Sequence, residues 1–338
     1  MKFAINSLLA LVVTSSSLAA NWETKRGKNE SGPGDQLDIF QSGKPVARFI
    51  FGKGQKKPFL HILGRDGELL TNPGVDENGK DAGKYPHHRG IYIGWNKIES
   101  DLGNRDLWHL NKGEWITVKE VKTSTTDNGA KLVATIEWLA SQKDDSASQL
   151  LISETRTLSI SRIADGATQV DAHFSLKAAR DLRLNGDLQH AGIHFRANTS
   201  VANREKDTSY LSDPADKSTK GPDWQPGGKS KKDENIKRGQ LKWARLLFPI
   251  GDNWYSAMEM NSPKNPSAEL SWRSYGRFGF FFKKDLTKDE TLEIDYRFII
   301  TPEKAPAEKT TLSGAQVNEA SKRCVAHWTR FLKDLAHE

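Results

Sequence analysis

Histidine and arginine side chains adjoin one another in residues 85–95, and these residue types transfer protons and bind anions. His87, His88 and Arg89 stand directly before a short run of alternating apolar residues. Histidine titrates near neutral pH, and the planar arginine fork suits carboxylates. Successive side chains of a strand point to opposite sides, so both histidines face one cleft only if the chain turns here. The competing interpretation is a solvated strand end at which the histidines cap backbone groups.

Two further segments repeat this combination of residue types. In one, Asp106 is followed three residues later by His109. In the other, His190, His194 and Arg196 occupy even-numbered positions between apolar residues. A strand would place these three side chains in one row on one face, with about 7 Å between successive same-face positions. The pattern therefore predicts a polar face on a strand whose other face packs in a core.

A fourth segment places Tyr275 and Arg277 before an aromatic run. The four segments fit general acid–base catalysis, in which histidine or tyrosine moves a proton and arginine neutralises an enolate-like charge. Lyases and epimerases that act on uronic acids need that combination. The candidates for proton transfer are His87, His88, His190, His194 and Tyr275. The candidates for substrate binding are Arg89, Trp95, Trp108, His109, Arg196 and Arg277, although core packing competes with sugar stacking for each tryptophan.

Other chemistries are less well supported. Same-face histidines four residues apart on a strand are too distant for easy shared ligation of a metal, and the helical His-Glu-x-x-His spacing is absent. We therefore predict no cofactor, and a divalent metal held by histidines from several strands stays an alternative. Two-carboxylate glycoside hydrolysis has Glu154, Asp106 and Asp187 available, but no pattern pairs them. A structural ion pair between Glu154 and Arg156 is the favoured interpretation of that strand.

Charge and the N-terminal pattern narrow the class of protein. The 338-residue chain has a formal net charge of +7, which fits an anionic partner such as an acidic polysaccharide, although solubility alone explains it equally well. Lysine and arginine are interleaved with acidic residues, which argues against nucleic acid as a partner.

Residues 1–20 combine a basic start, an apolar run and small residues, so we expect a secretory signal peptide and export to the periplasm or beyond. That run is too short to span a bilayer.

The remaining pattern predicts an all-β protein. From residue 37 onward, short alternating runs are separated by Gly, Pro, Asn and Asp, without helical segments between them. This favours an antiparallel β-sandwich over residues 37–302. Polar residues 21–36 predict a flexible lead-in, and the apolar-poor stretch 198–237 predicts a long loop. Apolar residues at three- and four-residue spacing predict an amphipathic helix within 303–338, which would bury the only cysteine, Cys324.

Four motifs carry a resemblance to a known family. They are Pro-Phe-Leu-His at 58–61, Leu-Thr-Asn-Pro at 70–73, Tyr-Pro-His-His-Arg-Gly at 85–90 and Asp-Leu-Trp-His at 106–109. In this order they resemble the methane oxygenase PmoA-like family of exported bacterial proteins, to which 187–196 and 275–277 are also similar. The resemblance implies a β-sandwich related to sugar-binding and sugar-converting sandwiches, including the galactose-mutarotase-like supersandwich. It also implies that His87, His88, Arg89 and His109 are site residues, without fixing their roles.

The family name does not imply methane oxidation, because a membrane methane monooxygenase subunit is a bundle of spanning helices and this chain has no such stretch. The leading hypothesis is an exported enzyme that acts on an anionic carbohydrate by acid–base chemistry. The alternatives are a non-catalytic carbohydrate-binding module, which would use the tryptophans and arginines, and a metal-dependent oxidoreductase. Strand order decides whether the four segments meet in space.

Overall fold

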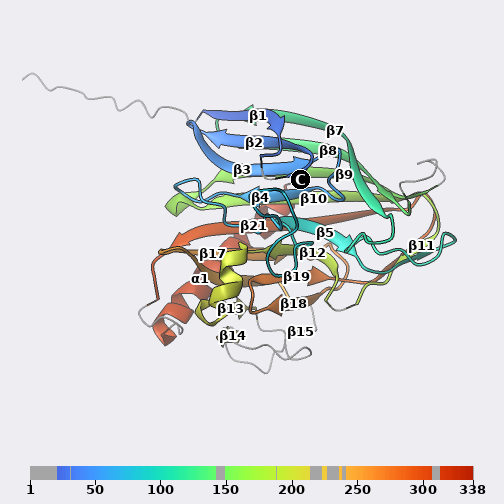
Figure 1. The fold of residues 1–338 in the computed structure, drawn as a ribbon. Coiled ribbons are helices and arrows are strands. Elements are labelled where there is room, and N and C mark those ends of the chain that lie inside the picture. Colours follow the sequence, from blue (N-terminus) through green and yellow to red (C-terminus); the bar gives the residue numbers. More distant parts are fainter. Residues whose placement is uncertain are drawn as a thin grey trace, which may run out of the picture.

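The computed structural model describes residues 21–30, 32–141, 149–187, 189–213, 223–226, 236–237, 241–306 and 313–337. The predicted signal peptide, 1–20, lies outside these residues. Within them the chain is mostly antiparallel β-sheet with one C-terminal α-helix (Figure 1), so the predicted fold class is confirmed. No helix in these ranges is long and apolar enough to cross a membrane.

Two large sheets and one small sheet make up the described structure. The first has the order β1 (Trp22–Lys28), β2 (Asp35–Gln41), β3 (Lys44–Phe51), β4 (Phe59–Ile62), β5 (Ile91–Trp95), β12 (Ala191–Arg196), β19 (Arg277–Phe281), β18 (Glu269–Arg273) and β15 (Ile236–Lys237). The second has the order β14 (Asp223–Pro226), β13 (Ser209–Ser212), β16 (Trp243–Ile250), β17 (Asn253–Asn261), β21 (Thr291–Glu303), β10 (Thr168–Ala178), β9 (Leu150–Arg162), β8 (Gly129–Leu139) and β7 (Trp115–Thr126). The small sheet has the order β20 (Lys284–Leu286), β11 (Leu182–Leu184) and β6 (Ile98–Ser100). Two 3-10 helices, η1 (Ala164–Gly166) and η2 (Thr199–Asp207), lie in connections.

The main core lies between the two large sheets. Along β10, Val170 and Leu176 are fully buried, whereas the intervening Asp171 and Ser175 are partly exposed, as the period of a half-buried strand requires. The sheets meet through large side chains: the rings of Phe195 on β12 and Phe248 on β16 lie 5.9 Å apart. Each large sheet therefore has one face in this core and one face turned outward.

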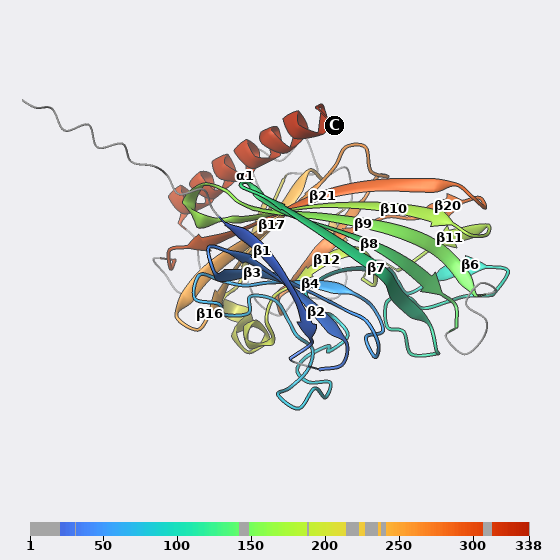
Figure 2. The same ribbon diagram turned by 90° about the horizontal axis from the view of Figure 1, so that it is seen from above.

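The C-terminal helix α1 (Gly314–Leu335) covers the outer face of the second sheet (Figure 2). Ser313 begins it with a capping box, in which its side chain accepts from Gln316 N and the Gln316 side chain accepts from Ser313 N. Cys324 packs against the sheet with the other apolar residues of the helix and is buried. Burial raises the pKa of this thiol to about 12, which agrees with the prediction of an unreactive core cysteine.

Two predicted segments differ from the structure. The sequence predicts a flexible lead-in over 21–36, but Trp22–Lys28 within it forms β1, which pairs with β2 along its whole length and buries Trp22, and Asp35 and Gln36 already belong to β2. The expected long loop, 198–237, contains η2, β13, β14 and β15 where it is described, and its other residues lie outside the described ranges. β1 is polar because it lies at a sheet edge, where pairing needs few apolar residues, whereas β13 is buried although serines stand at both of its ends.

Candidate active site

Four segments of chain meet over the outer face of the first sheet. They precede β5, follow β6, precede β12 and connect β18 to β19, and β5, β12 and β19 are neighbours in that sheet. The register pairs Tyr92 with His194 and Ile93 with Ile193. Because the two isoleucines belong to the core between the sheets, alternation places Tyr92 and His194 on the outer face. Strand order thus brings together segments that are far apart in sequence.

A glycine allows one of these segments to lie directly on the sheet. A Cβ at Gly94 of β5 would stand 2.5 Å from the carbonyl oxygen of Leu107. Only glycine permits that approach, which places the following Trp108 and His109 over the strand. The four segments, together with Glu205 of η2, whose carboxylate pairs with Lys84, line a cavity of about 560 Å³.

The chain turns at the first segment. The backbone N–H of His88 donates to the Tyr85 carbonyl at 3.0 Å, with Pro86 at the second position of the turn, which proline favours. The rings of His87 and His88 lie 4.1 Å apart and both line the cavity. The turn meets the condition under which both histidines face one cleft.

Two histidines are held by aspartates that stand three residues before them. His109 Nδ1 lies 2.8 Å from Asp106 Oδ2, and His190 Nδ1 lies 2.9 Å from Asp187 Oδ1. Burial by itself would raise the pKa of each aspartate, but hydrogen bonds from its histidine and from backbone N–H groups outweigh it and lower the pKa of both. The two imidazole rings are 5.0 Å apart. With Nδ1 held by a carboxylate, each ring has its Nε2 left for proton transfer at the cavity.

Two other histidines are kept neutral. Trp108 Nε1 donates to His88 Nε2 at 3.1 Å, and His194 Nε2 donates to the Ala191 carbonyl at 2.9 Å. Burial, with a further effect from the charge of Arg277, lowers the pKa of His88 and of His194 well below its usual value. His88 lines the cavity, whereas His194 is fully buried beneath Trp108, with ring centroids 4.9 Å apart.

Buried cations surround this group of histidines. Lys57, Arg196, Arg273 and Arg277 are each less than 9 % exposed, and within the described ranges none of them forms an ion pair. Their hydrogen bonds go mainly to backbone carbonyls, such as that from Arg277 Nη1 to the Gln189 carbonyl. Burial lowers the pKa of Lys57 to about 7 and that of Arg196 to about 10. Buried charges normally have partners, so a site with several unpaired cations is suited to an anionic ligand.

An exposed tyrosine stands at the rim of the cavity. Tyr85 is 43 % exposed, and its ring centroid lies 4.8 Å from that of Tyr275. Its backbone φ is 60°, a left-handed conformation that is uncommon outside glycine. Both rings line the cavity, and Lys84 Nζ lies over both of them. A sugar ring can therefore stack on an aromatic face at this rim.

Neither tryptophan predicted to bind sugar is accessible. Trp95 and Trp108 are both fully buried. Trp95 donates its indole N–H to the Phe282 carbonyl at 3.1 Å and packs against Trp138 in the core. Trp108 supports the histidines from beneath. The prediction that these two residues stack on sugar is therefore wrong, because Trp95 lies in the core between the sheets and Trp108 is buried against His88 and His194.

The structure divides the other predicted residues into three groups. His87, His88, His109, His190, Tyr275 and Arg277 line the same cavity. His194 and Arg196 lie beneath it, and the guanidinium of Arg196 is 4.9 Å from the centre of the Tyr275 ring. Arg89 lines a smaller neighbouring cavity and pairs with Asp81 at 2.6 Å. His190 and His194 do not form the predicted row, because β12 begins only at Ala191 and the turn held by Asp187 carries His190.

Several residues of the site were not predicted as members of it. The aspartates are visible in the sequence as a repeated Asp-Leu-x-His motif at 106–109 and 187–190, but the motif alone does not show that each carboxylate holds its own histidine. Tyr85 belongs to a motif that was singled out, but its exposure depends on the turn. Arg273 belongs to the same polar segment as Tyr275 and Arg277, but neither it nor Lys57 has a local pattern that predicts the burial of its charge.

The arrangement gives no support to the two other chemistries. In the described ranges, no group of three or more His, Cys, Asp or Glu side chains is arranged to hold a metal ion. Glu154 is buried, accepts from Arg156 Nε at 2.6 Å and from Trp138 Nε1 at 2.6 Å, and does not line the cavity. Glu154 and Arg156 therefore form the structural ion pair that the sequence pattern favours.

Comparison with known proteins gives a family but no activity. The model of a family of unknown function, DUF6807, matches residues 36–312. This comparison does not link the chain to the methane oxygenase PmoA-like family, and that resemblance stays a prediction. No curated protein matches the sequence.

Solved structures with a similar fold act on carbohydrates, but the likeness is weak. A glycoside hydrolase family 97 enzyme from Pseudoalteromonas sp. strain K8 has a TM-score of 0.44 and 11% identity, over 77% of this chain and 34% of that one. A galactose mutarotase related enzyme from Lactobacillus acidophilus has a TM-score of 0.37 and 7% identity, over 86% of this chain and 100% of that one. Heparan sulfate lyase HepC from Pedobacter heparinus has a TM-score of 0.35 and 14% identity, over 86% of this chain and 38% of that one. This chain thus spans about a third of the hydrolase, and TM-scores below 0.5 support no conclusion about activity.

Proposed function

Because this chain belongs to a family of unknown function, DUF6807, its activity has to be inferred from the site, and we propose that it is an enzyme that acts on an anionic carbohydrate by acid–base chemistry. The substrate class is a glycan containing uronic acid, and the reaction class is elimination or epimerisation. The resemblance to PmoA-like proteins contributes no chemistry to this proposal.

One observation carries it: two Asp–His pairs stand beside buried arginines that have no carboxylate partner within the described chain. His109 and His190 line the cavity with their Nδ1 atoms held by Asp106 and Asp187. Arg277 lines the same cavity. An uronic acid supplies both missing components, since its carboxylate pairs with arginine and its acidic C–H faces a base.

Both reactions begin with the same proton transfer. The Nε2 atom of His190 or His109 takes the proton from the carbon next to the substrate carboxylate, and the C–H electron pair moves into an enolate. Arg277 balances the negative charge that develops on the carboxylate oxygens. In elimination, the enolate expels the neighbouring glycosidic oxygen, which receives a proton from the other histidine. In epimerisation, the other histidine donates a proton to the opposite face of the same carbon, and no further reactant is consumed.

The remaining cavity residues have supporting roles. Tyr85 provides an exposed ring for stacking, and Tyr275, which lies between it and Arg196, is a second proton-transfer candidate. His87 and His88 line the cavity as neutral imidazoles: burial and the charge of Lys57 lower the pKa of His87 to about 3. His194 is fully buried and is a positioning residue, because it touches Trp108 rather than the cavity.

The test is incubation of the purified chain with a panel of uronic-acid and neutral glycans in deuterated water. Ultraviolet absorbance detects unsaturated products, NMR detects deuterium incorporated by an epimerase, and a reducing-end assay detects hydrolysis. We expect unsaturation or deuterium incorporation with uronic-acid glycans only, and its loss in His109→Gln and His190→Gln. Turnover that survives in the double variant, or reducing ends without unsaturation, would overturn the proposed chemistry.

The alternative of a binding module remains distinguishable in the same experiment. The exposed ring of Tyr85 is the observation that favours it, since stacking alone gives sugar affinity. Binding without product would support this alternative.

Export is a further part of the proposal and rests on residues 1–20. Mass spectrometry of the mature N-terminus from the native host checks it, and a retained Met1 would contradict it.

A further inference from the structure

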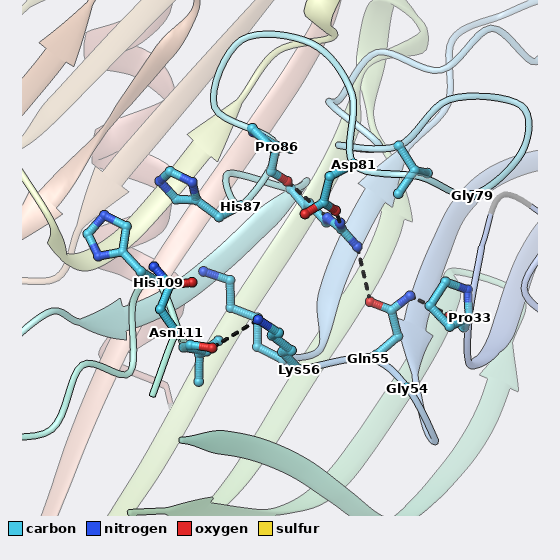
Figure 3. Close-up of a pocket in the computed structure, with 14 residues that line it drawn as sticks. Pro33, Gly54, Gln55, Lys56, Gly79, Asp81, Pro86, His87, His109 and Asn111 are labelled. Atoms are coloured by element: carbon cyan, nitrogen blue, oxygen red, sulfur yellow. Dashed lines mark hydrogen bonds and ion pairs between the residues drawn. The ribbon is translucent and has the colours of Figure 1, made fainter. Parts of the chain in front are cut away.

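A second, smaller cavity adjoins the candidate active site. It has a volume of about 210 Å³, and His87 and His109 line both cavities. Figure 3 shows these two histidines on one side of it, with Gln55 and Pro33 on the other. A ligand that occupies both cavities must therefore pass the two histidines.

Two lysines give the smaller cavity its charge. Lys56 Nζ donates to the Leu110 carbonyl at 3.0 Å, and Lys57 Nζ donates to the Trp108 carbonyl at 2.7 Å. Neither lysine pairs with a carboxylate among the described residues. The charge of Arg89, in contrast, is paired with Asp81. An ammonium group has three N–H donors, so each lysine has two left for a ligand.

The surroundings of Lys57 make its charge dependent on a ligand. The side chain is 5 % exposed, and its ammonium lies 4.5 Å from the centre of the Tyr92 ring and 5.5 Å from that of Trp108. Burial and the nearby charge of Arg89 disfavour the ammonium form, although the aromatic faces favour it. An oxyanion in the cavity would supply a counter-charge in direct contact, whereas the described chain offers only the charge of Asp106, which is paired with His109 and not with Lys57.

We propose that the smaller cavity is a second anion subsite, which binds a carboxylate or sulfate substituent on the sugar unit next to the one in the main cavity. This inference rests on the proposed function for the identity of the ligand as a sugar. It means that the substrate has at least two units and that the bond between them lies at His87 and His109. The charged substituent is held by Lys57 and Lys56.

Anion binding is tested on the full chain with selenate as the probe. Crystals soaked in selenate are expected to show an anomalous peak between Lys56 and Lys57. Thermal denaturation in increasing inorganic sulfate measures the affinity in solution, and acetate that displaces selenate more readily than sulfate does identifies a carboxylate site. Asn111 is exposed and lines the same cavity, so Asn111→Asp adds a negative charge without disturbing the core.

We expect Asn111→Asp and Lys57→Met to weaken the response to sulfate by about tenfold, as loss of a charge-assisted contact predicts. The matched control is Lys53→Gln, which removes an exposed charge of the same loop that does not line the cavity. An equal effect in the control would mean general screening. A selenate peak that persists in both cavity variants would mean an adventitious ion only. Either result would contradict the proposal that the smaller cavity is an anion subsite.

The subsite and the proposed function fail in different ways. If the panel finds an acidic glycan that is turned over, Asn111→Asp should raise KM for that glycan about tenfold, whereas the control Lys53→Gln should leave its KM and kcat unchanged. Turnover without that change means that the function holds and the subsite is wrong. Selenate binding that follows the variants, without turnover of any glycan, means that the anion site exists and the proposed reaction is wrong.

Discussion

Asp106 Oδ2 lies 2.8 Å from Nδ1 of His109, and the same relationship recurs between Asp187 and His190 at 2.9 Å. In both pairs the aspartate also accepts backbone N–H groups of the turn that carries the histidine. The carboxylate therefore fixes the turn, the ring orientation and the tautomer together. The two pairs stand side by side, with ring centroids 5.0 Å apart, although 81 residues separate them in sequence.

The first prediction concerns the tautomers of these histidines. Asp106→Asn or Asp187→Asn replaces a carboxylate with an amide that no longer demands a proton on Nδ1. We expect each variant to lower kcat by about 10²-fold or more, because the wrong nitrogen is then protonated at the cavity. ¹⁵N NMR of the imidazole nitrogens should show a change of tautomer in the substituted pair only. Asp127→Asn, in the exposed β7–β8 turn, is the matched control, and an equal loss of kcat there would refute the assignment.

The sequence predicts the sheet architecture better than the site. Alternation along β10 is sufficient to identify its buried residues, because a strand with one dry face must repeat every second residue, whereas every residue of β12 is buried, including His194 and Arg196 of its polar face. The relation between His109 and His190 is different, since it depends on β5 and β12 being neighbours. Strand order is set by long-range pairing, which leaves no local pattern. The repeated Asp-Leu-x-His motif indicates each pair separately but not their meeting.

The second prediction concerns the aromatic residue that binds sugar. Tyr85→Ala removes the exposed ring at the rim, so we expect KM to rise about tenfold with little change in melting temperature. Trp95→Phe removes a buried indole and its hydrogen bond to the Phe282 carbonyl, so it should lower the melting temperature and leave KM unchanged. Parallel kinetics and thermal denaturation check both. If KM followed Trp95 rather than Tyr85, the rim would not be the stacking surface.

Burial separates the aromatic residues that can stack on a sugar from those that cannot. Tryptophan next to polar motifs suggests sugar stacking, but Trp108 supports His88 from beneath and Trp95 belongs to the core. Tyr85 became accessible through a turn with positive φ, which nothing in a Tyr-Pro dipeptide requires. Similarly, Lys57 is indistinguishable from its neighbour Lys56 in the sequence, although only Lys57 is buried.

The third prediction separates charge in the site from charge in the scaffold. Arg277→Met removes a buried cation that has no carboxylate partner among the described residues, so no opposite charge is left uncompensated. Arg156→Met strands the buried carboxylate of Glu154, which typically costs about 3–5 kcal/mol of unfolding free energy. We therefore expect Arg277→Met to abolish the preference for acidic over neutral glycans with the smaller loss of stability. Chemical denaturation and kinetics on both glycan types measure this, and the reverse order of stability would contradict it.

The last prediction is a loss of stability in acid that originates in neutral buried histidines. Burial, with a smaller effect from Arg48, lowers the pKa of His61 to about 3, against a usual value of 6.5 in the unfolded chain. Between these two values the unfolded chain binds the extra proton, so the unfolding free energy falls as pH falls from about 6.5 towards 3 and is unaffected above that window. The slope for one such histidine is about 1.4 kcal/mol per pH unit. His61→Gln keeps a polar partner for Thr71, whose hydroxyl lies 2.8 Å from His61 Nδ1, and removes the titration. Urea denaturation at several pH values between 4 and 8 should therefore give a shallower acid slope in this variant than in the wild type, whereas an unchanged slope would show that His61 is protonated in the folded protein.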